Sequence, residues 1–247
     1  MLSAQAMSSS SPGEVTRYAR RVARTRDQSR RRQELVSATA ALVSRKGLSG
    51  VRLRDVADAT GLTSGAVLYY YGSLDELFTA AYDRAIDRFC RQRERAIAGI
   101  EDPAHRLATA IRMAIPTGPD DHEIRLLYEL EPVAFRDQAC AALMSAYIER
   151  QVAMYAAILE IGARTHVFEL THDARTIARN LVSLEDGQGL YVLMGRDDPH
   201  EVERRILDYL AAATQIDRER LNVGPQTQQP SNRPGSHDPV ASRRSAV

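Results

Sequence analysis

The sequence predicts an all-α fold, with an N-terminal three-helix domain followed by a larger helical domain. Apolar residues recur every three or four positions, and no run of alternating apolar residues is long enough to predict a strand. Helix signals punctuate this pattern, among them the Ser73 and Glu76 capping box and the Lys46-Gly47 stop. The chain has 247 residues, 44% of them hydrophobic and 26% charged. This composition argues against a disordered chain, a fibre and a membrane bundle.

The periodic segments predict the helices in order. A first helix carries the stripe Leu35, Ala38 and Leu42 and stops at Gly47, and two short helices follow on either side of Gly61. Pro132 is expected to end or kink the sixth helix. The remaining helices are expected at about residues 74–100, 103–115, 121–131, 139–161, 173–194 and 199–215.

Both ends of the chain are predicted to be disordered. Residues 1–28 form a Ser-rich and then Arg-rich arm with almost no large apolar residue, and residues 218–247 are rich in Pro, Gln, Ser and Asn. The N-terminus lacks the apolar core of a signal peptide, and Cys90 and Cys140 have no CxxC partners. We therefore expect a cytoplasmic protein with no membrane partner, no metal site and no cofactor.

Charge is segregated along the chain although the net charge is only +1. Residues 14–72 contain 12 Arg and Lys against 5 Asp and Glu, whereas residues 73–217 contain 16 against 25. The N-terminal range is basic and the following range is acidic, which indicates that only the N-terminal range binds a polyanion. Nucleic acid is the usual example of such a partner.

Residues 53–71, LRDVADATGLTSGAVLYYY, have the pattern of a helix-turn-helix. Val56 and Ala57 supply the inner face of a short helix, Gly61 permits a sharp turn, and Thr63 can cap a second short helix. The second helix of such a motif enters the major groove of DNA. The sequence therefore predicts a DNA-binding domain at residues 29–73, followed by a second domain at residues 74–217.

The segment from about residue 33 to 78 resembles the TetR family of transcriptional regulators, through DVA, GLTSGAVLYYY and SLDELF. The resemblance implies an all-helical homodimer whose C-terminal domain binds a small ligand. It also implies a regulator, most simply a repressor that binds a palindromic DNA operator and is released by a small-molecule effector. Leu74 stands where the family often has a Lys that contacts phosphate, and Arg52, Leu68 and Tyr71 also depart from the common pattern.

Carried over by position, the resemblance implies that Ser64, Ala66 and Tyr69 face base edges. Arg52, Thr63 and Tyr70 would lie nearer phosphates, and Arg45 and Lys46 would add charge. An ordinary core position is the alternative for Tyr69, Tyr70 and Tyr71. The arginine-rich arm is either a phosphate or minor-groove anchor or a solvated polycation.

The second domain is expected to enclose an effector cavity. Acidic groups beside tyrosines would suit a cationic ligand such as a choline-like compound or a polyamine, and an apolar ligand is the alternative. The stretch LVSLEDGQGLYVLM is loosely similar to the choline-responsive branch of the family. The alternatives for individual positions are ordinary core and solvated surface. The candidate ligand-binding residues are Tyr128, Glu131, Phe135, Tyr147, Met154, Tyr155, Glu185 and Gln188.

A homodimer is expected through residues 173–194 and 199–215, which would form half of an intermolecular four-helix bundle. The predicted interface stripes consist of Ile177, Leu181, Leu184 and Tyr191 on one helix and Val202, Ile206, Tyr209, Leu210 and Ala213 on the next.

An enzyme or a helical interaction protein that uses the helix-turn-helix only structurally is the competing interpretation. The sequence has no GxxxxGK loop, no GxSxG elbow and no HExxH pair. We therefore expect no catalytic residues.

Overall fold

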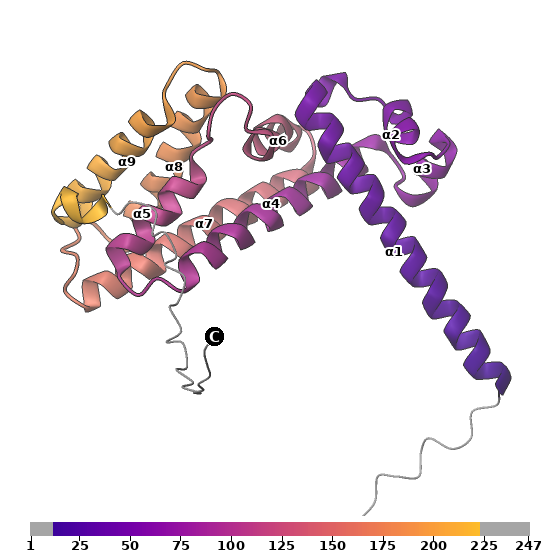
Figure 1. Ribbon diagram of the computed structural model, residues 1–247, viewed down its shortest axis with the longest axis horizontal. Coiled ribbons are helices and arrows are strands. Elements are labelled where there is room, and N and C mark those ends of the chain that lie inside the picture. The colour runs from indigo at the N-terminus through magenta and orange to yellow at the C-terminus, as the bar shows by residue number, and fades with distance from the viewer. Residues whose placement is uncertain (1–11, 223–247) are drawn as a thin grey trace, which may run out of the picture.

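The computed structural model describes the backbone of residues 12–222 and the side chains from residue 22 onward, residue 130 excepted. Within that range the chain is α-helical with short 3₁₀ turns and contains no β-strand, as predicted. In Figure 1 the helices form a small N-terminal group joined to a longer bundle. No helix in the described range is long and apolar enough to cross a membrane.

Three helices make the N-terminal group: α1 (Pro12–Lys46), α2 (Leu53–Thr60) and α3 (Ser64–Tyr70), with a 3₁₀ turn, η1 (Leu48–Gly50), after α1. Gly47 and Gly61 end α1 and α2 with φ of 70° and 66°, a left-handed region that favours glycine. Val56 and Val67 are fully buried between these helices. The predicted turn chemistry is confirmed.

The predicted disordered arm at residues 1–28 is wrong for residues 12–28, which are helical. In Figure 1 the N-terminal half of α1 projects away from the rest of the molecule. Arg, Ala and Gln are good helix formers, and Pro12 suits a first helical turn. Ion pairs one turn apart, Arg30 with Asp27 (2.8 Å) and Arg31 with Glu34 (2.7 Å), support the same conformation. The lack of apolar residues in this segment therefore indicates an exposed helix and not a disordered arm. The segment can be helical because it extends a helix that buried Leu35 anchors to the core. Residues 1–11 lie outside the described range.

The second group begins with the long helix α4 (Leu74–Ala98). It continues with α5 (Pro103–Ala114), α6 (His122–Leu130), the 3₁₀ turn η2 (Glu131–Phe135), α7 (Gln138–Arg164), α8 (Ala174–Leu193), α9 (Pro199–Thr214) and η3 (Arg218–Leu221). The start of each α-helix in this group is fixed by a side chain that accepts a backbone N–H of the first turn. These caps are Ser73, Asp102, Asp121, Asp137, Asp173 and Asp198.

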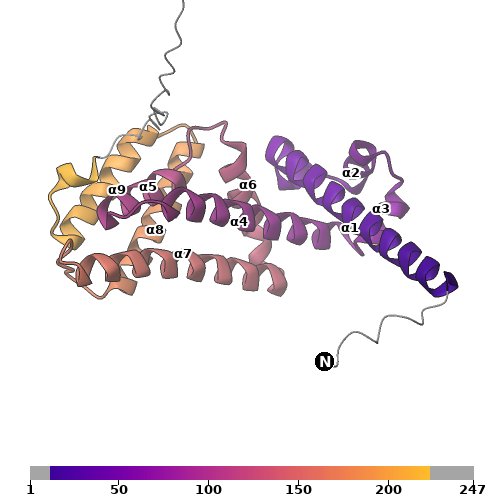
Figure 2. The ribbon, with the colours of Figure 1, turned by 60° about the horizontal axis from the view of Figure 1, so that its bottom comes forward.

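Two buried cores organise the chain, and α4 belongs to both. The first half of α4, from Leu77 to Cys90, packs with α1, α2, α3 and α6, whereas Ile97 at its end packs with α5, α7, α8 and α9. Figure 2 shows α4 running alongside α7 and reaching the N-terminal group. The predicted boundary at residue 73 therefore precedes a helix that contributes to both cores.

The predicted disordered tail also begins too early. Residues 218–221 form η3, Leu221 is fully buried, and Arg218 pairs with Asp208 (2.8 Å). One buried leucine and one ion pair are enough to hold the segment against α9. Residues 223–247 lie outside the described range.

The predicted dimer stripes lie mostly inside the protomer. Ile177, Leu181, Val202, Ile206, Leu210 and Ala213 belong to the core of the second group. Helical period reveals that a face is apolar but not whether the same chain covers it. Of the predicted interface residues, Tyr191 stays exposed (48%), and Leu190 and Met194 beside it, which were not predicted, expose 43% and 60% of their area.

Candidate functional site

The recognition helix α3 has one buried residue, and half of the others are exposed. Val67 is fully buried, whereas Tyr69 exposes 69% of its surface. The Thr63 hydroxyl caps the helix by accepting the Ala66 N–H (3.2 Å). Ser64 and Ala66 are half-buried at its first turn. The start of α3 therefore presents small side chains, which allow close approach to another surface.

Two tyrosines share the end of α3. The Tyr69 and Tyr70 rings meet edge to face, with centroids 5.4 Å apart, and Tyr70 packs against the first core while Tyr69 points outward. Leu68 exposes 41% of its area beside them and was not predicted as a contact. A large apolar residue on the outward side of a recognition helix is the signal that would have identified it, because apolar side chains can contact thymine methyl groups.

The basic residues next to α2 are partly committed to internal contacts. Lys46 pairs with Asp55 (2.7 Å), which also accepts the backbone N–H of Arg52 (2.7 Å). These two contacts hold the pKa of Asp55 below its usual value. The side chains of Arg45 and Arg52 are exposed. Lys46 and the backbone of Arg52 therefore meet at Asp55, while the Arg45 and Arg52 side chains stay open to solvent.

A buried polar network lies in the second group. Arg93, 1% exposed, donates to Gln151 Oε1 (2.8 Å) and to the carbonyl of Ala110 (2.9 Å). It also bonds the Tyr155 hydroxyl and lies 3.4 Å from Glu185, and Tyr155 itself donates to Glu185. Sequence reasoning missed Arg93. The signal was an arginine on the apolar stripe of α4, between Cys90 and Ile97.

Next to this network, three carboxyl groups border a small cavity of about 20 Å³. Glu131, Glu185 and Asp186 supply the acidic groups, and the other lining side chains are Phe89, Ala114, Ile124, Leu127, Tyr128 and Tyr147. We call this space the acidic cavity. Its volume suffices for about one water molecule.

Burial dominates the ionisation of these carboxyl groups. It raises the pKa of Glu131 to about 7, and the neighbouring Asp186 adds to the rise. Burial also raises the pKa of Glu185 to about 7 and that of Asp186 to about 6, although the Arg93 guanidinium acts in the opposite direction on both. A cation bound here would favour the ionised carboxylates, because opposite charges lower a carboxyl pKa.

The predicted ligand-binding residues are only partly brought together. Tyr128, Glu131, Tyr147 and Glu185 border the acidic cavity, and Tyr155 lies behind it in the Arg93 network. Phe135 does not, because it is 88% exposed on η2, after Pro132 has ended the regular helix. Met154 packs against the core of the second group, and Gln188 has a buried Oε1 without a hydrogen-bond partner in the described structure. Neither residue lines the acidic cavity.

Helix α6 connects this cavity with the N-terminal group. The Tyr128 hydroxyl donates to the backbone carbonyl of Asp186 on α8 (2.8 Å). The next residue, Glu129, accepts the backbone N–H of Leu48 just after α1 (3.1 Å). Adjacent residues of α6 thus bond to α8 and to the turn after α1. A shift of α6 would therefore strain both hydrogen bonds.

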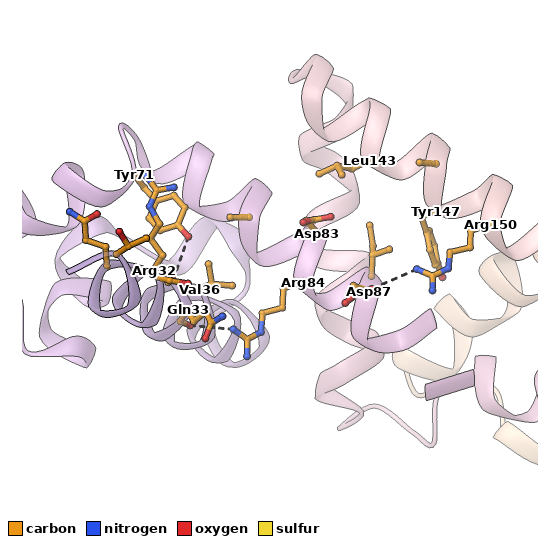
Figure 3. Close-up of a pocket in the computed structure, with 16 residues that line it drawn as sticks. Arg32, Gln33, Val36, Tyr71, Asp83, Arg84, Asp87, Leu143, Tyr147 and Arg150 are labelled. Atoms are coloured by element: carbon orange, nitrogen blue, oxygen red, sulfur yellow. Dashed lines mark hydrogen bonds and ion pairs between the residues drawn. The ribbon is translucent and has the colours of Figure 1, made fainter. Parts of the chain in front are cut away.

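An open groove of about 970 Å³ separates α1 from α7 on another face (Figure 3). Arg32 and Tyr71 lie at its N-terminal wall, where the tyrosine hydroxyl meets the Arg32 carbonyl (3.4 Å). Tyr147 and Arg150 lie at the opposite wall, where Arg150 approaches Asp87 (3.8 Å). Mixed charge and a wide mouth make this groove a solvated surface between the two groups.

The sequence of the N-terminal group matches a known family profile. Residues 35–81 match the profile described as "Bacterial regulatory proteins, tetR family". This segment is similar in sequence to that family. The match spans α2, α3 and the flanking parts of α1 and α4, the elements that present the recognition helix.

Relatives of the tetR-type segment are regulators by name. The HTH-type transcriptional repressor KstR2 of Rhodococcus jostii is 33% identical over 84 residues, which cover 32% of this chain and 40% of that protein. The HTH-type transcriptional regulator BetI of Burkholderia ambifaria is 30% identical over 82 residues, covering 33% and 42%. The chain thus aligns with about two fifths of the length of these curated relatives.

Similarity to solved structures extends beyond that segment. A putative transcriptional regulator from Saccharomonospora viridis, solved in complex with choline, superposes with a TM-score of 0.70 at 21% identity. The superposition covers 75% of this chain and 98% of that one. The helical second group therefore shares its fold with that protein.

Proposed function

We propose that this protein is a ligand-responsive transcriptional regulator, and specifically a repressor that binds a palindromic operator as a dimer and is released by a small cation. The single observation that carries the proposal is the exposed recognition helix α3, anchored by Val67 and carrying Tyr69 outward. No catalytic role is assigned, in keeping with relatives that are regulators by name. Its site of action would be the cytoplasm, where a bacterial operator lies.

DNA binding is supported by shape and charge together. The Thr63 cap and the small residues after it let α3 approach a groove, and the N-terminal residues 14–72 carry a net positive charge. A two-fold dimer would place two such helices about 34 Å apart or a small multiple of that distance, which requires a palindromic site.

The acidic cavity is the proposed effector site. Three carboxyl groups and two tyrosines surround it, an arrangement that suits a cation through charge and cation–π attraction. The choline complex of the Saccharomonospora viridis regulator supports the same ligand class. Because the closed cavity holds only about 20 Å³, binding requires it to open.

Helix α6 would transmit that opening. Expansion of the cavity displaces Tyr128, and Glu129 then pulls on the Leu48 amide at the end of α1. A coupling of about 1–3 kcal/mol between effector and operator is typical of such linkage.

The test is a mobility-shift titration with the DNA upstream of the protein's own gene. We expect a shifted complex whose affinity falls steeply with salt and whose footprint is palindromic. Choline should weaken the complex for the wild-type protein and have less effect on Asp186→Asn. A complex with any DNA that is insensitive to salt, or no complex at all, would contradict the regulator and favour a structural use of the helix-turn-helix.

A further inference from the structure

Another cavity lies where the N-terminal group meets the second group. It measures about 570 Å³ and is bounded by α1, α4, α5 and α6. We call it the junction cavity. Its walls are largely apolar, with Ala40, Ala85, Phe89, Met113, Ile115 and Leu126 among them. This volume lies within the range of about 300–1,000 Å³ found for small-molecule sites.

Phe89 and Ile124 line both the junction cavity and the acidic cavity. The two spaces are therefore neighbours separated by these side chains. Phe89 is half-buried, and its ring meets Tyr147 edge to face at 6.1 Å on the acidic side. Displacement of the Phe89 ring would join the two cavities.

Each cavity lacks what the other supplies. The acidic cavity has charge but room for only about one water molecule. The junction cavity has room and apolar walls, while its ionic groups are engaged at its edges: Arg88 pairs with Glu123, and Arg112 pairs with Glu203 (2.8 Å). A ligand that uses both spaces needs a cationic head and an apolar body.

We propose that the effector is an amphipathic cation whose head enters the acidic cavity past Phe89 and whose apolar body fills the junction cavity. The inference rests on the proposed function and specifies the ligand of the same site. It also makes the regulation direct. The apolar body would contact Ala40, Ala41 and Ser44 of α1, so the ligand itself would touch the helix that carries the DNA-binding group.

The experiment measures binding to the full-length protein by calorimetry, without DNA. The probes are tetramethylammonium, choline and alkyltrimethylammonium ions with butyl to decyl chains, each below its micelle concentration, with decanoate and decanol as matched controls. We expect affinity to rise about fourfold for each added methylene, the ratio expected for burying one CH₂ group, until the cavity is full. Decanoate should bind more weakly than the decyl cation.

Two kinds of variant separate head from body. Ala85→Leu fills the junction cavity from α4 and should weaken the decyl cation at least tenfold while leaving tetramethylammonium unchanged. Ala41→Leu, on the exposed face of α1, is the second filling variant in case the first disturbs folding. Ala23→Leu, exposed on the same helix and outside the junction cavity, is the matched control and should change neither. Asp186→Asn should weaken all the cations by a similar factor.

The outcomes distinguish this inference from the proposed function. Affinity that is independent of chain length, or decanoate that binds as tightly as the decyl cation, overturns the two-cavity ligand while leaving a cation-responsive regulator possible. Chain-length dependence that survives both filling variants also overturns it. Failure of every cation to bind, with the operator still bound, contradicts the proposed effector class as well.

Discussion

Within α3, some side chains are buried and anchor the helix, and others are exposed to solvent. Val67 has no exposed surface, whereas two positions later Tyr69 exposes 69%. Residues two apart on a helix point to different sides, so one can be buried while the other faces solvent. Substitutions at the two positions should therefore have opposite signatures.

Tyr69→Ala should weaken operator binding by about 1–3 kcal/mol if the ring contacts a base. The free energy of unfolding should change by less than about 0.5 kcal/mol, because the side chain is exposed. Mobility shift and urea unfolding measure the two quantities. Val67→Ala provides the reverse control, with a loss of about 2 kcal/mol of stability. Full operator affinity in Tyr69→Ala would remove this residue from the interface.

The acidic residues make stability depend on pH. Burial raises the pKa values of Glu131 and Glu185 from 4.5 to about 7 and that of Asp186 from 3.8 to about 6. Between about pH 4 and pH 7 the folded state keeps protons that the unfolded chain has released. The contribution of these groups to the free energy of unfolding is therefore fully present below pH 4 and is lost as the pH rises through 7.

We expect the urea midpoint of the wild-type protein to fall more between pH 5 and pH 8 than that of Glu131→Gln. Tetramethylammonium binding should move the other way, tightening by up to about tenfold per pH unit for each proton released. Calorimetry in buffers of different ionisation enthalpy counts those protons. Equal pH slopes for the two proteins would mean that Glu131 is ionised in the folded state throughout.

Among the elements, α6 is the one that touches both functional regions. It meets α8 through Tyr128 and the turn after α1 through Glu129. The close approach to α8 depends on Gly189, where an added Cβ would lie 2.6 Å from the Tyr128 hydroxyl oxygen. Glycine at this position serves helix packing, since its backbone lies within a regular helix.

Gly189→Ala should push α6 away from α8 and break the Tyr128 hydrogen bond. Overpacking of this kind costs about 1–3 kcal/mol of stability. The double variant with Tyr128→Phe removes the clashing oxygen and should recover part of the loss, which thermal unfolding of the four proteins can measure as a coupling energy. Strict additivity of the two substitutions would show that the clash is relieved elsewhere.

For the whole molecule, dimerisation decides whether α3 can read a palindrome. The apolar surface that the protomer leaves on α8 consists of Leu190, Tyr191 and Met194. These residues fall within one turn at the end of the helix, within the segment expected to pair.

Tyr191→Asp should therefore shift the protein from dimer to monomer and weaken operator binding, because one recognition helix loses the contribution of the other. Light scattering coupled to size exclusion measures the mass. Phe135→Asp introduces the same charge at a residue that is 88% exposed outside α8 and should leave the dimer intact. A Tyr191→Asp protein that stays dimeric would place the interface elsewhere.

Local information in the sequence was sufficient for the helix order, the turn at Gly61 and the caps at Ser73 and Thr63, because these features depend on residues within one helical turn. It also predicted that α3 is the recognition helix. It failed at residues 12–28, where low hydrophobicity marks an exposed helix. Segments without apolar residues can still be helical when they extend an anchored helix.

Only the tertiary structure decided which distant residues meet. Arg93 and Glu185 are 92 positions apart and lie 3.4 Å from each other, and Ile177 and Ile206 turned out to be covered within the same chain. Such pairings depend on how helices cross and on which face each turns inward, and the helical period of one segment carries neither quantity. The sequence alone determined a helix-turn-helix protein with an acidic helical partner domain. Packing determined that its carboxyl groups converge on a cavity that shares Phe89 with the junction cavity beside α1.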